Sequence, residues 1–203
     1  MEAYMSNTPR ISSLAALAAL LTCQAGAARE PVLGVGERVE ARWDGDLDGD
    51  GEADIAYIAR DQDGRELVVA LSRGLTESLE LDPDPLGSGE LSAPRGVLLL
   101  KDLTGGTTAV SSTRRWRYDA RTRRMRLIGL DATLYSRTYA HAGFEASWNL
   151  LTGDVITREL RLNSAGGERA YNPAIEKRSK RRSPSLYLPQ SADPDALVGW
   201  GED

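Results

Sequence analysis

The sequence predicts an all-β protein, either an antiparallel sandwich or a partly closed barrel. Two observations lead to this prediction. Short segments in which apolar and polar residues alternate recur along the chain, and turn-forming residues separate them. No stretch after residue 27 keeps the 3.6-residue hydrophobic period of a long helix. Short antiparallel strands joined by tight turns are typical of sandwiches and small barrels.

The predicted strands can be placed in order by their alternation and by the turns between them. The first is RVEARW at residues 38–43, where Val39, Ala41 and Trp43 alternate with charged residues. GVLLLK at 96–101 is a short apolar run. Three hairpins are predicted, each with two strand-like segments around a short turn: residues 54–72 around DQDG, 114–130 around ARTR, and 144–162 around TGD.

Two segments lack this pattern. Residues 77–95 hold three Pro and two Gly, which predicts a long surface loop. Residues 171–203 follow the predicted β domain, residues 28–170, as an irregular C-terminal segment with a possible edge strand in SLYLP, residues 185–189. The basic run at 177–182 is either a solvated segment or a contact for anionic lipid or an acidic partner.

The N-terminus is typical of an export signal. ISSLAALAALL is an apolar run of 11 residues, too short to span a bilayer, and small residues follow it. We expect a signal peptide at residues 1–27, cleaved after Ala27, and a periplasmic or secreted protein. LLTC suggests the alternative of an outer-membrane lipoprotein anchored through a lipid on Cys23, and a third reading is a buried helix that stays attached.

Composition limits the function classes. The net charge of −5 argues against a nucleic-acid-binding protein. Cys23 is the single cysteine and lies in the predicted signal, so the mature chain would have neither a disulfide nor a thiol nucleophile. Its stability must come from packing, hydrogen bonding and any bound metal.

An aspartate-rich segment, DGDLDGDGEAD, lies between the first two predicted strands. Its carboxylates fall at positions one, three, five and nine of a loop that begins at Asp46, with glycine at position six. Calcium takes six to eight oxygen ligands, and alternate residues of a tight turn can all point inward. The spacing therefore predicts a calcium-loop hairpin near the mature N-terminus, rather than a merely solvated acidic turn. The predicted ligands, with Glu52 acting through its carbonyl, are Asp46, Asp48, Asp50, Glu52 and Asp54.

DLDGDGEADIAYI resembles the calcium loops of FG-GAP and VCBS-type β-propeller repeats, in which the loop leads directly into a strand. The resemblance covers about thirteen residues and occurs once, so it implies the calcium loop and not a propeller. The loop differs from an EF-hand because Tyr57 stands at position twelve, where an EF-hand has a bidentate Glu. A structural ion would fix the crossing between the two flanking strands.

Motifs for catalysis are missing from the sequence. His141 is the single histidine, and there is no G-x-S-x-G, phosphate-binding loop or His cluster for zinc. We therefore expect a protein that is not an enzyme. A carboxylate-based hydrolase that uses Glu145 is retained as the third of three functional hypotheses.

The central block, residues 116–153, resembles a block in secreted proteins and lipoproteins of Gram-negative bacteria, with a Y-D…R-L-I-G hairpin and an E-x-S-x-N-x-L-T-G strand and turn. By architecture it distantly resembles calcium-containing periplasmic immunity lipoproteins of the lysozyme-inhibitor type. That resemblance implies a module that binds or inhibits a protein partner in the cell envelope, such as a lysozyme-like enzyme. The alternative is a calcium-stapled structural envelope protein.

Polar residues of this block provide the candidate partner surface. Glu145, Ser147 and Asn149 share one face of a predicted strand, opposite an apolar set that belongs to the core. Arg115 and Arg117 lie on one face of the preceding hairpin, in a segment dense in arginine. These five residues form either a recognition surface or a solvated, internally paired face.

Overall fold

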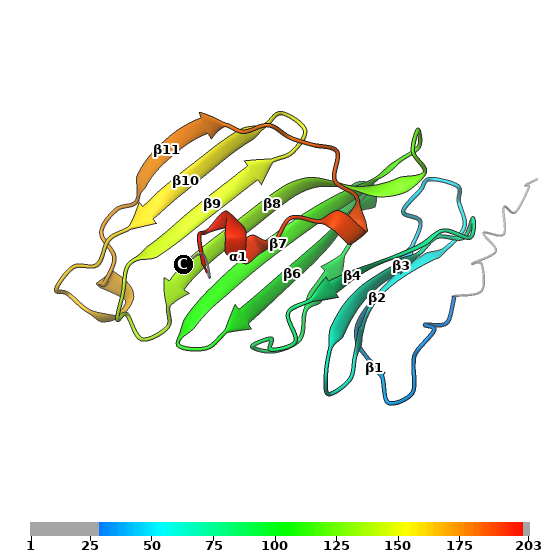
Figure 1. Cartoon of the computed structure of the whole chain (residues 1–203), viewed down its shortest axis with the longest axis horizontal. Coiled ribbons are helices and arrows are strands. Elements are labelled where there is room, and N and C mark those ends of the chain that lie inside the picture. Colours follow the sequence, from blue (N-terminus) through cyan, green and yellow to red (C-terminus); the bar gives the residue numbers. More distant parts are fainter. Residues whose placement is uncertain (1–28, 201–203) are drawn as a thin grey trace, which may run out of the picture.

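The computed structural model describes residues 29–200, so the predicted signal peptide and Cys23 lie outside the described residues. The chain forms two antiparallel sheets (Figure 1). The smaller sheet has four strands in sequence order: β1 (Arg38–Gly45), β2 (Asp54–Arg60), β3 (Arg65–Ala70) and β4 (Thr76–Leu81). No helix in the described part is long and apolar enough to cross a membrane.

The larger sheet has seven strands, again in sequence order, and neither sheet closes into a barrel. This arrangement confirms the all-β prediction and selects the sandwich. The strands are β5 (Glu90–Ser92), β6 (Val97–Gly105), β7 (Thr108–Asp119), β8 (Arg124–Ser136), β9 (Gly143–Asn149), β10 (Asp154–Leu160) and β11 (Ile175–Lys180). The short helices are η1 (Pro94–Gly96), η2 (Gly167–Arg169), η3 (Leu188–Gln190) and α1 (Pro194–Leu197).

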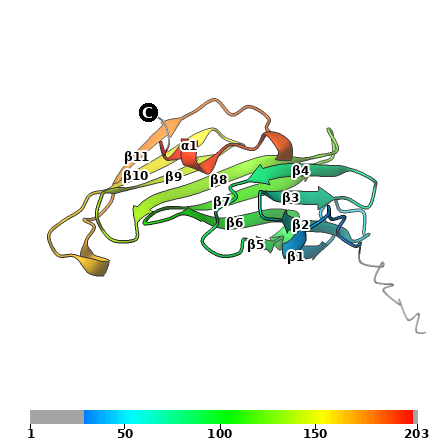
Figure 2. The ribbon, with the colours of Figure 1, turned by 60° about the horizontal axis from the view of Figure 1, so that its bottom comes forward.

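The core lies between the sheets. The smaller sheet covers one end of the larger one, while β9, β10 and β11 extend beyond it (Figure 2). Fully buried side chains from both sheets meet there, including Ile58, Leu67, Leu98 and Trp116. Burial of each such side chain contributes roughly 1.5–3 kcal/mol, so this interface is the main source of stability. We call the face of the larger sheet that packs against the smaller sheet its inner face, and the opposite face its outer face.

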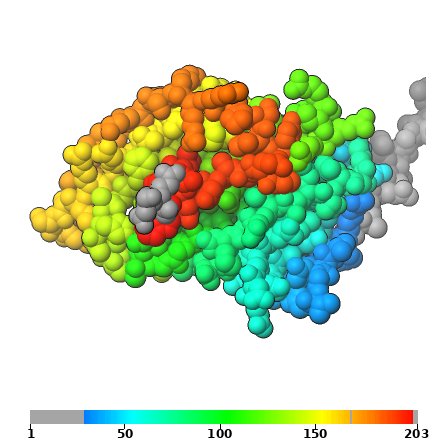
Figure 3. Space-filling view, in the orientation of Figure 1, coloured from blue at the N-terminus to red at the C-terminus, as the bar shows by residue number. Residues whose placement is uncertain are grey.

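Residues 186–198, the C-terminal strap, cross the inner face beside the smaller sheet (Figure 3). Leu188 is fully buried in the common core, and the Trp116 indole N–H donates to Ser191 Oγ at 2.8 Å. Val198 packs in a cluster with Val110 and Ala132 of the larger sheet. The strap therefore supplies the second layer where the smaller sheet ends.

Two predictions made for irregular segments are wrong. Residues 77–95 are not one long loop, because β4 and β5 occupy both ends of the segment. Leu79 and Leu81 alternate into the core as β4 pairs with β3, a period that the Pro and Gly content obscured. Segment 171–203 does contain an edge strand, but this strand is β11, which overlaps the start of the basic run and whose residues are exposed. Residues 185–189 instead form one isolated bridge and the start of η3.

A buried ion-pair cluster joins the two sheets. Arg65 of β3 has a side chain that is 0% exposed, and it bonds Glu40 of β1 and Asp102 of β6. Its Nε and Nη2 donate to the Glu40 carboxylate at 2.9 and 2.7 Å, and its Nη1 and Nη2 donate to Asp102 at 3.1 and 3.2 Å. The Gly89 N–H also donates to Glu40, at 2.8 Å. Every charge in the cluster is thus paired and hydrogen-bonded.

Because of this ion-pair cluster, we expect the free energy of unfolding to fall in acid. Burial alone raises the pKa of Glu40, but hydrogen bonds from Arg65 and Gly89, with the charges of Arg65 and Arg60, hold that pKa below its ordinary value. The Glu40 contribution is therefore complete above the unfolded-state pKa of about 4.3 and is lost as pH falls through the lower folded pKa. Urea unfolding between pH 7 and pH 3 should show a smaller acid loss in Glu40→Gln than in the wild type. Equal pH dependence of the two proteins would contradict this assignment.

Candidate functional site

The aspartate loop connects β1 to β2 at one end of the smaller sheet. The two strands pair up to Gly45 and Asp54, so the residues between them must turn sharply. Gly49 and Gly51 have φ of 80° and 86°, a left-handed conformation that strains other residues. Gly51, at position six of the loop, thus has a backbone conformation that suits glycine. Leu47 is buried and anchors the loop in the common core.

Backbone N–H groups organise the carboxylates of the loop. Asp46 accepts from the N–H groups of Gly49 and Gly51 at 2.6 and 2.9 Å. Asp54, 1% exposed, accepts from Leu47 N at 2.7 Å through Oδ2 and from Ser72 N at 2.7 Å through Oδ1. Asp54 therefore ties the loop to the β3–β4 turn. Both of its oxygens hold backbone groups in this structure.

Three of the predicted ligands converge. Asp46, Asp48 and Asp50 each offer a carboxylate oxygen within 4.8 Å of the other two. The Asp48 side chain is 0% exposed, and its Oδ2 is buried without a hydrogen-bond partner in the described chain. Burial, together with the charges of Asp54 and Asp50, holds the pKa of Asp48 above its ordinary value. A buried carboxylate oxygen with no donor is costly, and a cation would remove that cost.

The donor set fits a hard divalent cation. All the converging groups are carboxylate oxygens, the ligands that calcium and magnesium prefer, and no sulfur or imidazole of residues 29–200 joins them. Glu52 lies at the exposed end of the loop, where its N–H donates to Asp50 Oδ1 at 2.8 Å. Asp46, Asp48 and Asp50 would hold such an ion by their side chains, and it would supply structural charge neutralisation.

Sequence reasoning missed two residues of this site. Ser72 Oγ and Arg73 Nε both donate to Asp50 Oδ2 at 2.8 Å, and Arg73 Nε lies 3.5 Å from Asp48 Oδ2. They come from the β3–β4 turn, far along the chain from the loop. Nothing in the local pattern signals this contact, because it depends on how the turn packs. The Arg73 side chain is 58% exposed.

The five residues predicted to bind a partner share the outer face of the larger sheet. Arg115 and Arg117 lie on β7, and Glu145, Ser147 and Asn149 lie on β9, with β8 between them. Pairing places Arg115 opposite Gly129 and Gly129 opposite Asn149, so the two sets lie across one strand from each other.

Part of this outer surface is internally paired. Asp131 of β8 accepts from Arg115 at 2.5 Å and from the Ser147 hydroxyl at 2.6 Å. Glu145 pairs with Arg158 at 3.3 Å, and Arg158 also pairs with Glu176 of β11. Of the two alternatives given for this face, internal pairing describes Arg115. Arg117, by contrast, has no carboxylate within ion-pair distance in the described chain.

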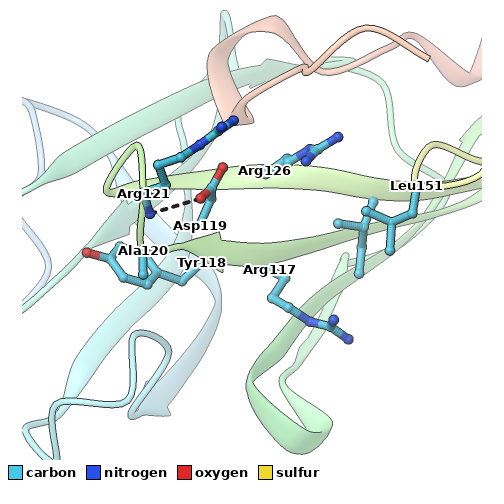
Figure 4. Close-up of a pocket in the computed structure, with 8 residues that line it drawn as sticks. Arg117, Tyr118, Asp119, Ala120, Arg121, Arg126 and Leu151 are labelled. Carbon is cyan, nitrogen blue, oxygen red and sulfur yellow. Dashed lines mark hydrogen bonds between the residues drawn. The ribbon is translucent and has the colours of Figure 1, made fainter. Parts of the chain in front are cut away.

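Arg117 belongs to a shallow pocket of about 330 Å³ at the β7–β8 hairpin. Figure 4 shows Arg117 and Arg126 reaching toward the side on which Leu151 lies, with Arg121 and Asp119 at the hairpin end. The carboxylate of Asp119 accepts the Arg121 backbone N–H at 3.0 Å. None of the three arginines forms an ion pair within residues 29–200. The Nε of Arg126 is buried without a hydrogen-bond partner there.

His141 lies in the turn between β8 and β9. Its Nε2 is 2.8 Å from the Thr108 hydroxyl, and its Nδ1 is 2.6 Å from the Ala142 carbonyl oxygen. Both ring nitrogens are thus engaged, so the ring holds the turn against the start of β7.

The fold and the loop together define a β-sandwich with a candidate cation loop at one end of its smaller sheet and an arginine pocket at the β7–β8 hairpin of its larger sheet. Comparison with protein-family models, with curated proteins and with solved structures finds no match for this chain.

Proposed function

We propose that this protein is an exported, calcium-stapled binding module that acts without catalysis and recognises an acidic surface of a protein partner in the cell envelope. The observation that carries the proposal is the group of three arginines at the β7–β8 hairpin, Arg117, Arg121 and Arg126, whose side chains form no ion pair within residues 29–200. In a chain with net charge −5, this local excess of positive charge is an asymmetry that favours a negatively charged partner.

The composition of the pocket supports a protein partner. Arginine guanidinium groups bind carboxylates in a bidentate manner, and arginine is enriched among interface residues that dominate binding energy. Ile128 lines the same pocket, and Leu151 is 53% exposed at its edge. A charged patch with an adjacent apolar contact suits an acidic side chain followed by an apolar one.

Calcium has a structural role in the proposal. The ion would join Asp46, Asp48 and Asp50 within the β1–β2 connection and so hold the end of the smaller sheet. The loop and the arginine pocket belong to different sheets. We therefore expect partner binding to depend on calcium only through the stability of the fold.

The test is capture from an envelope extract by immobilised protein in millimolar calcium, followed by affinity measurement with the purified partner. The double variant Arg117→Glu/Arg126→Glu should weaken binding at least about tenfold, because charge reversal repels an acidic surface. Arg38→Glu, an exposed charge reversal on β1 of the smaller sheet, is the control and should bind as the wild type does. Inhibition of a lysozyme-like enzyme is assayed in parallel with the same variants.

Equal binding by the wild type and the double variant would contradict the assigned surface. Retention on the envelope with no protein captured would instead favour the calcium-stapled structural protein.

A further inference from the structure

A second polar cavity lies on the opposite side of the larger sheet, between the two layers. It has a volume of about 390 Å³ and is bounded by β4, by β6 and β7, and by the C-terminal strap. Cavities that bind small molecules generally measure about 300–1,000 Å³ and combine apolar walls with a few converging polar groups. This cavity has both, since Leu79, Leu81 and Pro194 line it together with charged side chains from the sheet and the strap.

Arg114 of β7 provides the positive charge of this cavity. It is a buried residue, 8% exposed, on the inner face. Its one hydrogen bond within the described chain runs from Nε to the Ala192 carbonyl at 3.4 Å, and it forms no ion pair there. Asp102 lines the same cavity, but its carboxylate is already bonded by Arg65. The Nη groups of Arg114 thus have neither a carboxylate nor a carbonyl partner in residues 29–200.

The strap provides negative charge on another wall. Asp193 caps α1 by accepting the Asp195 N–H at 3.0 Å, and the Asp195 carboxylate accepts no hydrogen bond in the described chain. Burial, with the charges of Asp193 and Asp82, holds the pKa of Asp195 above its ordinary value. A guanidinium and a carboxylate therefore line one cavity without reaching each other.

The geometry points to a binding site for a small zwitterion of the α-amino acid class, its carboxylate on Arg114 and its ammonium group on Asp195 and Asp193. A purely anionic ligand would meet the repulsion of the strap carboxylates. A purely cationic ligand would leave Arg114 without a partner. A molecule that carries both charges satisfies both walls, and charge-assisted hydrogen bonds in a partly buried site are the strong ones. The site lies on the inner face and is independent of the partner surface proposed above.

Isothermal titration calorimetry of the purified full chain tests this site. The probes are glycine, L-alanine and L-glutamine, with acetate and methylammonium as fragments that carry one charge each. We expect at least one zwitterion to bind and both fragments to bind at least about tenfold more weakly. Arg114→Gln and Asp195→Asn should each weaken zwitterion binding by a similar factor. Arg115→Gln, the adjacent position on the outer face, is the control that should not change it.

Absence of binding by all three zwitterions to the folded wild type would overturn the proposal. So would binding that neither Arg114→Gln nor Asp195→Asn weakens. Circular dichroism establishes that each variant is folded. If Arg114→Gln does not fold, the half-buried strap residue Asp195 decides the question through Asp195→Asn.

Discussion

Calcium is expected to raise the thermal midpoint of this protein, and Asp48→Asn is expected to abolish that rise. A ligand that binds only the folded state stabilises it by RT ln(1 + [L]/Kd), about 2.7 kcal/mol at a hundredfold excess over Kd. We expect Asp48 to be the decisive ligand because its buried Oδ2 has no hydrogen-bond partner in the described chain. Because no bidentate Glu stands at position twelve, we expect weak affinity, about 10⁻⁴–10⁻³ M, so millimolar calcium is required.

The measurement compares melting in calcium and in chelator for the wild type, Asp48→Asn and Asp61→Asn. Asp61 is the matched control, because its Oδ1 also caps a turn of the smaller sheet, where it accepts from Asp63 N and Gly64 N. The control should respond to calcium as the wild type does. A calcium response retained in Asp48→Asn would remove the aspartate loop as the metal centre, and no response in the wild type would reduce it to a solvated turn.

Arg65→Met is expected to destabilise the protein by about 3–5 kcal/mol. The substitution leaves Glu40 and Asp102 as buried carboxylates whose side chains are 5% and 4% exposed, so their charges lose their main compensation. The loss is large because the desolvation of both acids is no longer offset. Urea denaturation at pH 7 measures it as a shift in midpoint at an unchanged slope.

Arg60→Met is the control for this prediction. Arg60 also pairs with Glu40, at 3.6 Å, but its side chain is 29% exposed. A partly exposed pair contributes about 0–1 kcal/mol, so its loss should be small. The triple variant Glu40→Gln/Arg65→Met/Asp102→Asn should recover part of the stability, because it removes the unpaired charges as well. A loss below about 1 kcal/mol in Arg65→Met would show that the cluster does not hold the sheets together.

Most strands were predictable because their signals are local. The alternation at residues 38–43 corresponds to β1. The hairpins β2–β3, β7–β8 and β9–β10 form around the predicted turns DQDG, ARTR and TGD, respectively. Where local signals conflict, prediction failed. Proline and glycine in residues 77–95 outweighed the alternation of Leu79 and Leu81, which form β4 because β3 supplies a neighbour and the core takes their side chains.

The candidate sites divide in the same way. Convergence of Asp46, Asp48 and Asp50 follows from spacing, since alternate residues of a tight glycine-containing turn can point to one centre. Arg73 could not be predicted, because it reaches Asp50 only when the β3–β4 turn packs on the loop. Arg114 and Arg115 are adjacent in a run of basic residues, yet the strand sends one into a cavity and the other to the outer face.

The sequence by itself determined the all-β class, the hairpins and the convergence of the loop aspartates, because each depends on residues within a few positions of one another. The tertiary structure decided that the strands form two open sheets, that Arg65 joins them, and that the strap meets Arg114 across a cavity. These features bring together residues far apart in the chain. Their pairing depends on which surfaces the whole fold buries, and local alternation and turn residues do not encode that choice.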